Sequence, residues 1–202
     1  MTDPDASQDL TLGTAADAIA WLEGSPLPED QRQLLARFTE RFSTLTFARE
    51  TDESLDRMAA AEGIEVPAWY RAVRTTLAFV HPPMRVRFDD YDSLGPRSDN
   101  VEDIWYELQP GYADSEQRGL FRDQARCYPI GRWFGTDQSY LAVNLEDPAD
   151  ERIHEFAAED LRDNLYDGKP ARASVYVAFD SYASMLDHIA EGELPDGTRL
   201  PG

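Results

Sequence analysis

The residue types that most often carry catalysis are sparse in this chain. Cys127 and three histidines (His81, His154 and His188) are the only candidates for a thiol–imidazole pair. No local signature surrounds Cys127, and it begins a strand-like pattern where a small buried residue is expected. The serines fall in strand-like segments or at a helix cap, and no Gly-x-Ser-x-Gly turn is present. The sequence therefore favours a structural cysteine over a catalytic one.

Metal and phosphate sites are equally weakly indicated. The histidines are far apart, with neither His-x-x-x-His nor His-Glu-x-x-His spacing. The segment "GRWFGTD" at 131–137 lacks the lysine and the spacing of a phosphate-binding loop. Its bulky Trp133 and Phe134 would obstruct close backbone approach, so the segment is typical of a hairpin turn. We expect no metal and no cofactor.

Carboxylates, in contrast, are abundant. The chain has 39 Asp and Glu against 19 Lys and Arg, which gives a formal net charge of −20 and a pI near 4.3. Because acids are so common, a pair of them fits a solvated surface as well as acid–base chemistry, and a carboxylate-dependent hydrolase is the weaker alternative. A surface this negative repels nucleic acid and anionic lipid and attracts basic proteins. It also keeps a protein soluble, so charge alone leaves these two roles open.

Acidic residues interleaved with aromatic ones form the candidate binding surface. Rigid rings can anchor a partner, and carboxylates can steer a basic partner toward them. The aromatic residues, Trp105 and Tyr106 above all, would suit a core equally well. The candidate partner-binding residues are Asp89, Asp90, Tyr91, Asp92, Glu102, Asp103, Tyr106, Glu159, Asp160 and Asp163.

Length and composition predict an ordered protein of the cytoplasm. A chain of 202 residues buries roughly 70% of its unfolded surface, and 42% apolar residues argue against disorder. The acidic start, "MTDPDASQDL", is unlike a signal peptide. No apolar run approaches the ~20 residues of a membrane helix. The single cysteine fits a reducing compartment.

Helical periodicity fills the first part of the chain. After a polar tail at 1–13, helices are predicted from Thr14 to Gly24, from Pro28 to about residue 45, from Thr51 to Glu62 and from Pro67 onward. The apolar side of the first helix is predicted to be Ala16, Ile19, Ala20 and Leu22. Thr51 should cap the third helix, and Gly63 should end it in the left-handed conformation.

From Met84 the period changes to that of strands. Strands are predicted in "MRVRFDDY", "CYPIGRW", "SYLAVNL", "RIHEFA" and "RASVYVAF", with a hairpin joining the second and third. "GYADSEQRG" is predicted as a loop, and "EDLRDNLYDGKPA" as an acidic insertion. A closing helix, capped by Asp180 or Ser181, should bury Tyr182, Met185, Leu186 and Ile189. The predicted class is α+β, with N-terminal helices, a mainly antiparallel sheet and a C-terminal helix.

Three segments, taken in order, resemble the SUKH superfamily of Smi/Knr-type proteins. "SLDRMAAAEGIEVPAWYRAV" (54–73) looks like the family's opening helix, glycine, proline step and aromatic-bearing helix. "YPIGRWFGTDQSYLAVNLEDP" (128–148) is similar to its central hairpin, with Asn144 where Asp is common. "VAFDSYASMLDHI" (177–189) is similar to its closing strand and helix. The likeness covers about two thirds of the chain, and the shared order of the segments carries it.

The resemblance implies a SUKH-like α+β domain and a non-enzymatic role. Many bacterial members are immunity proteins that bind and block a toxin, often a nuclease. The expected function is therefore occlusion of a basic toxin by the acidic, aromatic surface, and the alternative is a regulatory or scaffold module that binds an endogenous protein. The expected organisation is a disordered acidic tail (1–13), a helical extension (14–50), the SUKH-like domain (51–195) and a short tail (196–202).

Overall fold

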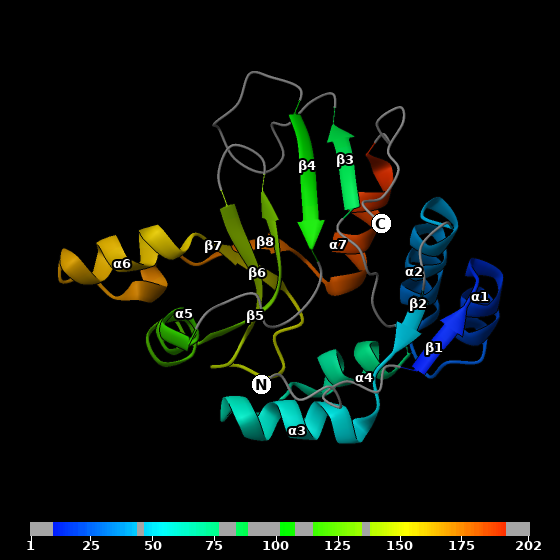
Figure 1. Cartoon of the computed structure of the whole chain (residues 1–202), viewed down its shortest axis with the longest axis horizontal. Coiled ribbons are helices and arrows are strands. Elements are labelled where there is room, and N and C mark those ends of the chain that lie inside the picture. The colour runs from blue at the N-terminus through cyan, green and yellow to red at the C-terminus, as the bar shows by residue number, and fades with distance from the viewer. Residues whose placement is uncertain are drawn as a thin grey trace, which may run out of the picture. The chain divides into compact units, whose positions relative to one another are not determined.

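The computed structural model describes residues 10–43, 47–76, 84–88, 102–107, 115–134 and 138–192 (Figure 1). The chain forms two compact units, Met1–His81 and Pro82–Gly202. The first combines helices with a two-stranded sheet, and the second holds a six-stranded antiparallel sheet with further helices. The predicted α+β class is confirmed. No helix within the described ranges is long and apolar enough to cross a membrane.

The first unit contains four helices and two short strands within its described ranges. They are β1 (Leu10–Gly13), α1 (Ala15–Glu23), α2 (Glu29–Arg41), β2 (Phe47–Arg49), α3 (Asp52–Glu62) and α4 (Ala68–Thr76). Strands β1 and β2 pair in antiparallel register. The last four residues of the predicted polar tail thus belong to a strand. Both strands were missed because segments of three or four residues are too short to show a two-residue period.

Helix ends in this unit follow the predicted local rules. Thr51 Oγ1 accepts a hydrogen bond of 3.1 Å from the Ser54 amide, as an N-cap should. Gly63 ends α3 with φ 67° and ψ 37°, the left-handed conformation that glycine adopts without a Cβ clash. Thr14 and Asp17 form a reciprocal capping box at the start of α1. These caps are local contacts, and for this reason sequence could predict where α3 begins and ends.

The buried side of α1 differs from the prediction. Ala18 and Leu22, spaced i and i+4, are buried, whereas Ala16 and Ala20 are exposed and Ile19 is half-buried. In an alanine-rich segment, alanine positions fit several helix faces equally well. The packing partner decides among them, and here α1 packs against α2.

The corner between α3 and α4 is a packed scaffold. Tyr70 and Val73 of α4 are buried together with Leu55 of α3. An ion pair joins the nearly buried Arg74 guanidinium to Glu50, which follows β2. Trp69 lies beside Tyr70 in an edge-on ring contact and stays half-buried. The Trp-Tyr pair therefore contributes to packing within the first unit.

The second unit is built on one antiparallel sheet with strand order β3-β4-β5-β6-β7-β8. Its strands are β3 (Met84–Phe88), β4 (Glu102–Glu107), β5 (Cys127–Phe134), β6 (Gln138–Asn144), β7 (Ile153–Phe156) and β8 (Tyr176–Phe179). The predicted hairpin is confirmed, because β5 pairs with β6 along its whole length. The shorter elements are α5 (Ser115–Gly119), the π-helical turn η2 (Leu120–Gln124), α6 (Ala158–Tyr166), the 3-10 turn η3 (Ala171–Ser174) and α7 (Tyr182–Glu191).

Two local predictions for this unit were wrong, and the predicted acidic insertion has a defined fold. The predicted loop around residue 115 begins a helix, α5. The acidic insertion is mostly the helix α6, anchored by the buried Ala158 and Leu161. The segment "RASVYVAF" is a strand only from Tyr176, because its first half forms η3 after Pro170. Tertiary contacts of Arg172 with the loop before β5 hold that first half out of the sheet.

The closing helix α7 was predicted correctly. Ser181 caps it through a capping box with Ser184. The predicted set Tyr182, Met185, Leu186 and Ile189 is buried. Here the helical period is repeated over more than two turns of strongly apolar residues, which leaves only one orientation for the helix.

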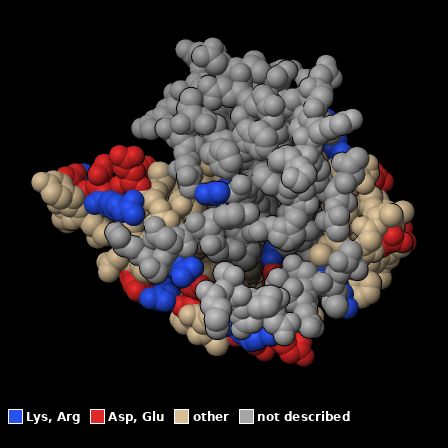
Figure 2. Space-filling view, in the orientation of Figure 1, with Lys and Arg blue, Asp and Glu red and all other residues tan. Residues whose placement is uncertain are grey.

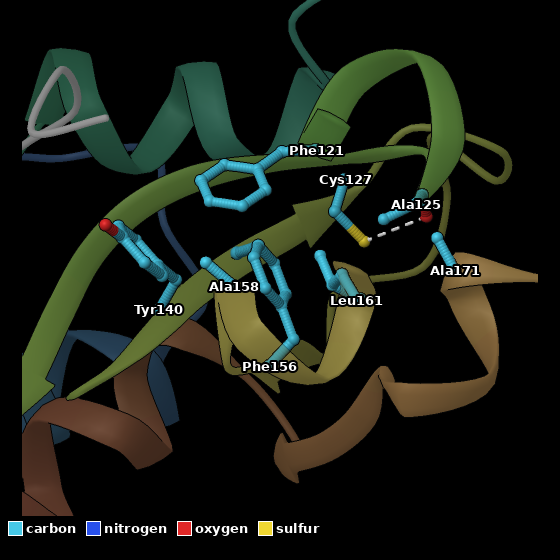
Figure 3. Packing of buried hydrophobic residues seen from close by; sticks show 9 residues of the cluster. Phe121, Ala125, Cys127, Tyr140, Phe156, Ala158, Leu161 and Ala171 are labelled. Carbon is cyan, nitrogen blue, oxygen red and sulfur yellow. Dashed lines mark hydrogen bonds between the residues drawn. The ribbon is translucent and has the colours of Figure 1, made fainter. Parts of the chain in front are cut away.

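One face of the sheet is sealed by a cluster of buried side chains (Figure 3). Phe121 of η2 lies with its ring centroid 4.7 Å from that of Phe156 on β7 and 4.8 Å from that of Tyr140 on β6. Leu161 of α6 and Cys127 of β5 belong to the same cluster, and its remaining members are Ala125, Ala142, Ala158 and Ala171. Each of the large apolar side chains contributes roughly 1.5–3 kcal/mol by burial, so this cluster fixes α6 to the sheet.

The two compact units divide the chain differently from the predicted domains. Helices α3 and α4 group with the preceding helices, whereas the sequence placed 51–195 together as one domain after an extension at 14–50. The domain limits, including the tails at 1–13 and 196–202, stay a prediction apart from the strand found at residues 10–13.

Candidate partner-binding surface

Helix α6 carries the part of the predicted surface whose side chains the structure describes. Glu159 and Asp160 occupy its first turn, where the helix dipole favours carboxylates. Ala158 and Leu161 turn into the core. The acidic residues consequently face away from the sheet, and all three predicted positions on this helix are exposed: Glu159, Asp160 and Asp163.

The outward side of α6 forms a narrow stripe. Glu159, Asp163 and Tyr166 are spaced i, i+4 and i+7, so they share one face of the helix. Tyr166 ends the stripe and is 93% exposed. A tyrosine buries large area at low entropic cost when it enters a partner, which makes an exposed ring beside carboxylates suited to protein recognition.

Both acidic and basic side chains surround this stripe, with the acidic ones on one side of it. Figure 2 shows acidic side chains along one edge of α6 with basic ones beside them. Asp160 and Asp167 flank the stripe on one side, and Asp167 pairs with Lys169 at 3.0 Å. Arg162 is exposed on the opposite flank. The stripe therefore has a defined negative side, which would orient a basic partner.

Hydrogen bonds hold the C-terminal end of α6 in place. The Asn164 side chain donates to Ser174 Oγ in η3, and the Lys169 amide donates to the Asn164 carbonyl at 2.7 Å. Helix and turn thus form a single projecting element beside β7 (Figure 1). A surface presented by such an anchored element loses little conformational entropy on binding.

The remaining predicted residues are not assembled with α6 by the described structure. Asp89, Asp90, Tyr91 and Asp92 lie outside the described residues. Glu102, Asp103 and Tyr106 lie in β4, where Arg87 of β3 is the backbone register partner of Asp103 and Trp133 of β5 is that of Tyr106. Strand β4 neighbours β5 in the sheet, and α6 packs with side chains of β5, β6 and β7. The side chains of the predicted surface that the structure describes are thus those of α6, and the rest of that surface stays a prediction.

Sequence reasoning missed a buried polar network at the turn between β6 and β7. Its centre is Asp150, whose Oδ1 accepts a 2.7 Å hydrogen bond from Arg152 Nε. Asp150 Oδ2 accepts from Asn144 Nδ2 at 3.1 Å and lies 3.1 Å from His154 Nε2. Asn144, Asp150 and His154 are all buried. A polar group that is buried in this way must be paired, and only tertiary structure shows the pairing.

Arg172 extends this network into η3. Its Nη1 donates to the Ala125 carbonyl at 2.9 Å, and its Nη2 donates to Asn144 Oδ1 at 3.0 Å. Its Nε lies 3.1 Å from a Glu146 carboxylate oxygen. One guanidinium therefore joins the start of β5, the end of β6 and the base of the α6–η3 element. The sequence signal for this network is the segment "NLEDPAD" (144–150), in which one amide and three carboxylates lie close together in a short turn.

The ionisation of these groups points to structure rather than catalysis. The Arg152 guanidinium, helped by Asn144 and His154, holds the pKa of Asp150 well below its usual range. Burial raises the pKa of the Cys127 thiol to about 11, although Arg172 acts in the opposite direction. Asp150 is thus a fixed anion, and Cys127 is a neutral thiol that donates to the Ala125 carbonyl. Neither has the protonation state of an acid–base or nucleophilic group at neutral pH.

Glu155 on β7 is the second unusual carboxylate. Burial raises its pKa, while hydrogen bonds from Ser139 and Trp133 act in the opposite direction. It lies half-buried on the strand next to the sheet edge, with Leu141 and Tyr176 as its register partners. Across the described ranges no group of three or more His, Cys, Asp or Glu side chains is arranged to hold a metal ion.

Comparison with known proteins adds no relative. No family model, curated protein or solved structure matches this chain.

Proposed function

We propose that this protein is a non-enzymatic binding protein that covers a basic surface of a partner protein, as an immunity protein of the SUKH type would cover a toxin. The observation that carries the proposal is the outward stripe of α6, in which two carboxylates and a nearly fully exposed tyrosine share one helix face. The resemblance of three ordered sequence segments supports the same role. We place this activity in the cytoplasm.

The proposed mechanism is electrostatic capture followed by burial of an aromatic anchor. A net charge of −20 speeds encounter with a basic surface, and the effect weakens as salt screens it. Tyr166 then enters the interface, where water is excluded and the ring contributes most to slow dissociation. A partner whose active face binds phosphates would lose access to its substrate, because the carboxylates occupy the same positive surface.

Co-expression with the product of the neighbouring coding sequence tests this proposal. We expect a stoichiometric complex whose affinity falls steadily as salt is raised from low to physiological strength. If the neighbour's product is toxic when expressed alone, co-expression should restore growth. Absence of a complex, or a complex whose affinity does not change with salt, would contradict the proposal.

A further inference from the structure

Strand β8 is more exposed than β5, β6 and β7, the other strands of its sheet whose burial is described. It is the last strand in the order β3-β4-β5-β6-β7-β8, so among described strands it pairs with β7 only. Tyr176 is 62% exposed and its neighbour Val177 is 46% exposed. Successive strand residues point to opposite faces, so both faces of the sheet are open to solvent at this edge.

The composition of β8 is unusual for an exposed edge. An edge strand presents unpaired N–H and C=O groups, and proteins commonly protect it with charged residues or proline. The sequence "YVAF" of β8 has neither. Two features limit unwanted pairing at this edge: the strand is short, and its pairing with β7 contains a bulge. The bulge is seen in the register, because Ile153 is opposite Phe179 whereas the next residue, His154, is opposite Val177. The bulge leaves the N-terminal half of the strand, at Tyr176 and Val177, regular and accessible.

The surroundings of this edge are predominantly acidic. Asp180 follows the strand and is exposed. Glu155 is the register partner of Tyr176, but its carboxylate is half-buried and accepts hydrogen bonds from Ser139 and Trp133 further inside the sheet. The turn η3 leads directly into β8, because only Val175 separates Ser174 from Tyr176. The side chain of Asn164 is hydrogen-bonded to Ser174, so the carboxylate-bearing helix α6 is attached close to the start of the strand. The basic side chains nearby, Arg152 and Arg172, are already paired with Asp150 and Glu146. An uncharged pairing edge is thus bordered by negative charge.

We propose that β8 is a docking edge to which an extended basic segment of the partner protein adds as a further antiparallel strand. Main-chain hydrogen bonds would supply the affinity, and lysine or arginine side chains of the added strand would face the acidic border. A second copy of this chain is the less suitable occupant, because two molecules of net charge −20 repel each other. The inference rests on the proposed function and names where on the molecule part of the contact is made.

A peptide experiment tests the edge independently of the natural partner. The probe is a synthetic peptide of alternating Lys and Val, about eight residues long, a typical strand length. Two matched peptides serve as controls: an alternating Glu–Val peptide, and the Lys–Val peptide N-methylated throughout, which keeps its charge but cannot donate main-chain hydrogen bonds. Binding to the full-length, isotope-labelled protein is followed through amide chemical shifts and amide hydrogen exchange.

We expect the Lys–Val peptide to shift the β8 amides and slow their exchange, whereas neither control peptide does so. Val177→Ser should weaken peptide binding about threefold, the range of one cross-strand pair. The matched variant Leu165→Ser, at an equally exposed aliphatic position on α6, should leave it unchanged.

Several results would overturn the docking edge. The first is that the methylated or the acidic peptide binds as tightly as the Lys–Val peptide. The second is that the Lys–Val peptide does not bind, and the third is that it shifts only amides of α6. A concentration-dependent dimer with β8 amides protected before peptide is added would assign the edge to a second copy. The neighbour's product can still form its salt-sensitive complex in each of these cases, so failure here is distinguishable from failure of the proposed function.

Discussion

Arg172 Nη2 donates a hydrogen bond of 3.0 Å to Asn144 Oδ1, and this contact ties η3 to the end of β6 across 28 positions of the sequence. The same guanidinium reaches the Ala125 carbonyl and Glu146. A planar guanidinium can satisfy acceptors in several directions at once, which a lysine cannot do. The position of α6 and η3 is therefore fixed both by the Arg172 side chain and by the apolar cluster that contains Leu161.

Replacing this side chain should loosen the second unit. Arg172→Ala removes a charged donor from acceptors that stay partly buried, so we expect the free energy of unfolding to fall by about 1.5–3 kcal/mol. Urea denaturation followed by circular dichroism measures the change. The control Arg162→Ala deletes an exposed arginine of α6 and should stay within about 0.5 kcal/mol of the unsubstituted protein. Equal losses in the two variants would refute the bridging role of Arg172.

The Asp150 network predicts a specific dependence of stability on pH. Its neighbours hold the pKa of Asp150 below the ~3.9 of an unfolded aspartate, so its contribution is complete above that value and is lost as pH falls toward the folded pKa. Asp150→Asn should lower the free energy of unfolding by about 1–3 kcal/mol at pH 7, because the amide cannot accept the same bonds. The gap between the two proteins should narrow below about pH 4. A gap that is constant with pH would contradict the ionised state of Asp150.

Glu155 predicts the opposite trend. Burial raises its pKa, so ionisation in the folded state costs free energy that is absent below the unfolded pKa and grows as pH rises through the folded one. Glu155→Gln should therefore melt at a higher temperature than the unsubstituted protein at pH 8, and the difference should disappear near pH 4. Glu151→Gln controls for the general relief of negative repulsion, because Glu151 is an exposed acid of the neighbouring turn. The same gain in both variants would contradict the local explanation.

The sequence predicted those features that local contacts determine. Thr51 and Gly63 bound α3 through hydrogen bonds and a backbone conformation only a few residues away, and Ser181 caps α7 in the same manner. The β5–β6 hairpin follows from strand pattern and a short turn. Each of these depends on neighbours along the chain, so composition and spacing suffice.

Features that depend on distant partners were not predictable. Strand β1 exists because β2 pairs with it some 35 positions later, although neither segment has a visible strand period. Residues 172–174 were predicted as the start of the strand "RASVYVAF" but lie in η3, because Arg172 is held at the Ala125 carbonyl. For the candidate surface, sequence identified the acids of α6 but not the helix that aligns two of them with Tyr166. To see this alignment one must first recognise the segment as a helix. Its many acidic residues leave few apolar ones to show the helical repeat.

Cys127 should react slowly with alkylating agents in the folded protein. Burial raises the pKa of its thiol to about 11, so only about one molecule in a thousand holds a thiolate at pH 8. The side chain is also inaccessible, since it lies in the apolar cluster under η2 and α6. Iodoacetamide labelling followed by mass spectrometry should show almost no modification in native buffer and rapid modification in urea. Rapid labelling without denaturant would show that the β5 end of the cluster opens.

Charge reversal on α6 should weaken capture of the partner more than the same reversal elsewhere. Glu159→Lys with Asp163→Lys places two positive charges on the outward stripe. We expect binding to the neighbour's product to fall by about 10–100-fold at low salt, mostly through slower association, and the deficit should shrink as salt is added.

The control for this experiment is Glu40→Lys with Glu53→Lys, two exposed acids of the first unit. Glu53 is the second residue of α3, as Glu159 is of α6, so both pairs include the same penalty at a helix start and the same change in net charge. Surface plasmon resonance at several salt concentrations measures both pairs, after thermal melts confirm that they fold. Because bulk charge is equal in the two variants, a larger loss on α6 reflects direct contact. Equal losses would mean that net charge alone attracts the partner and that the α6 stripe is not the binding surface.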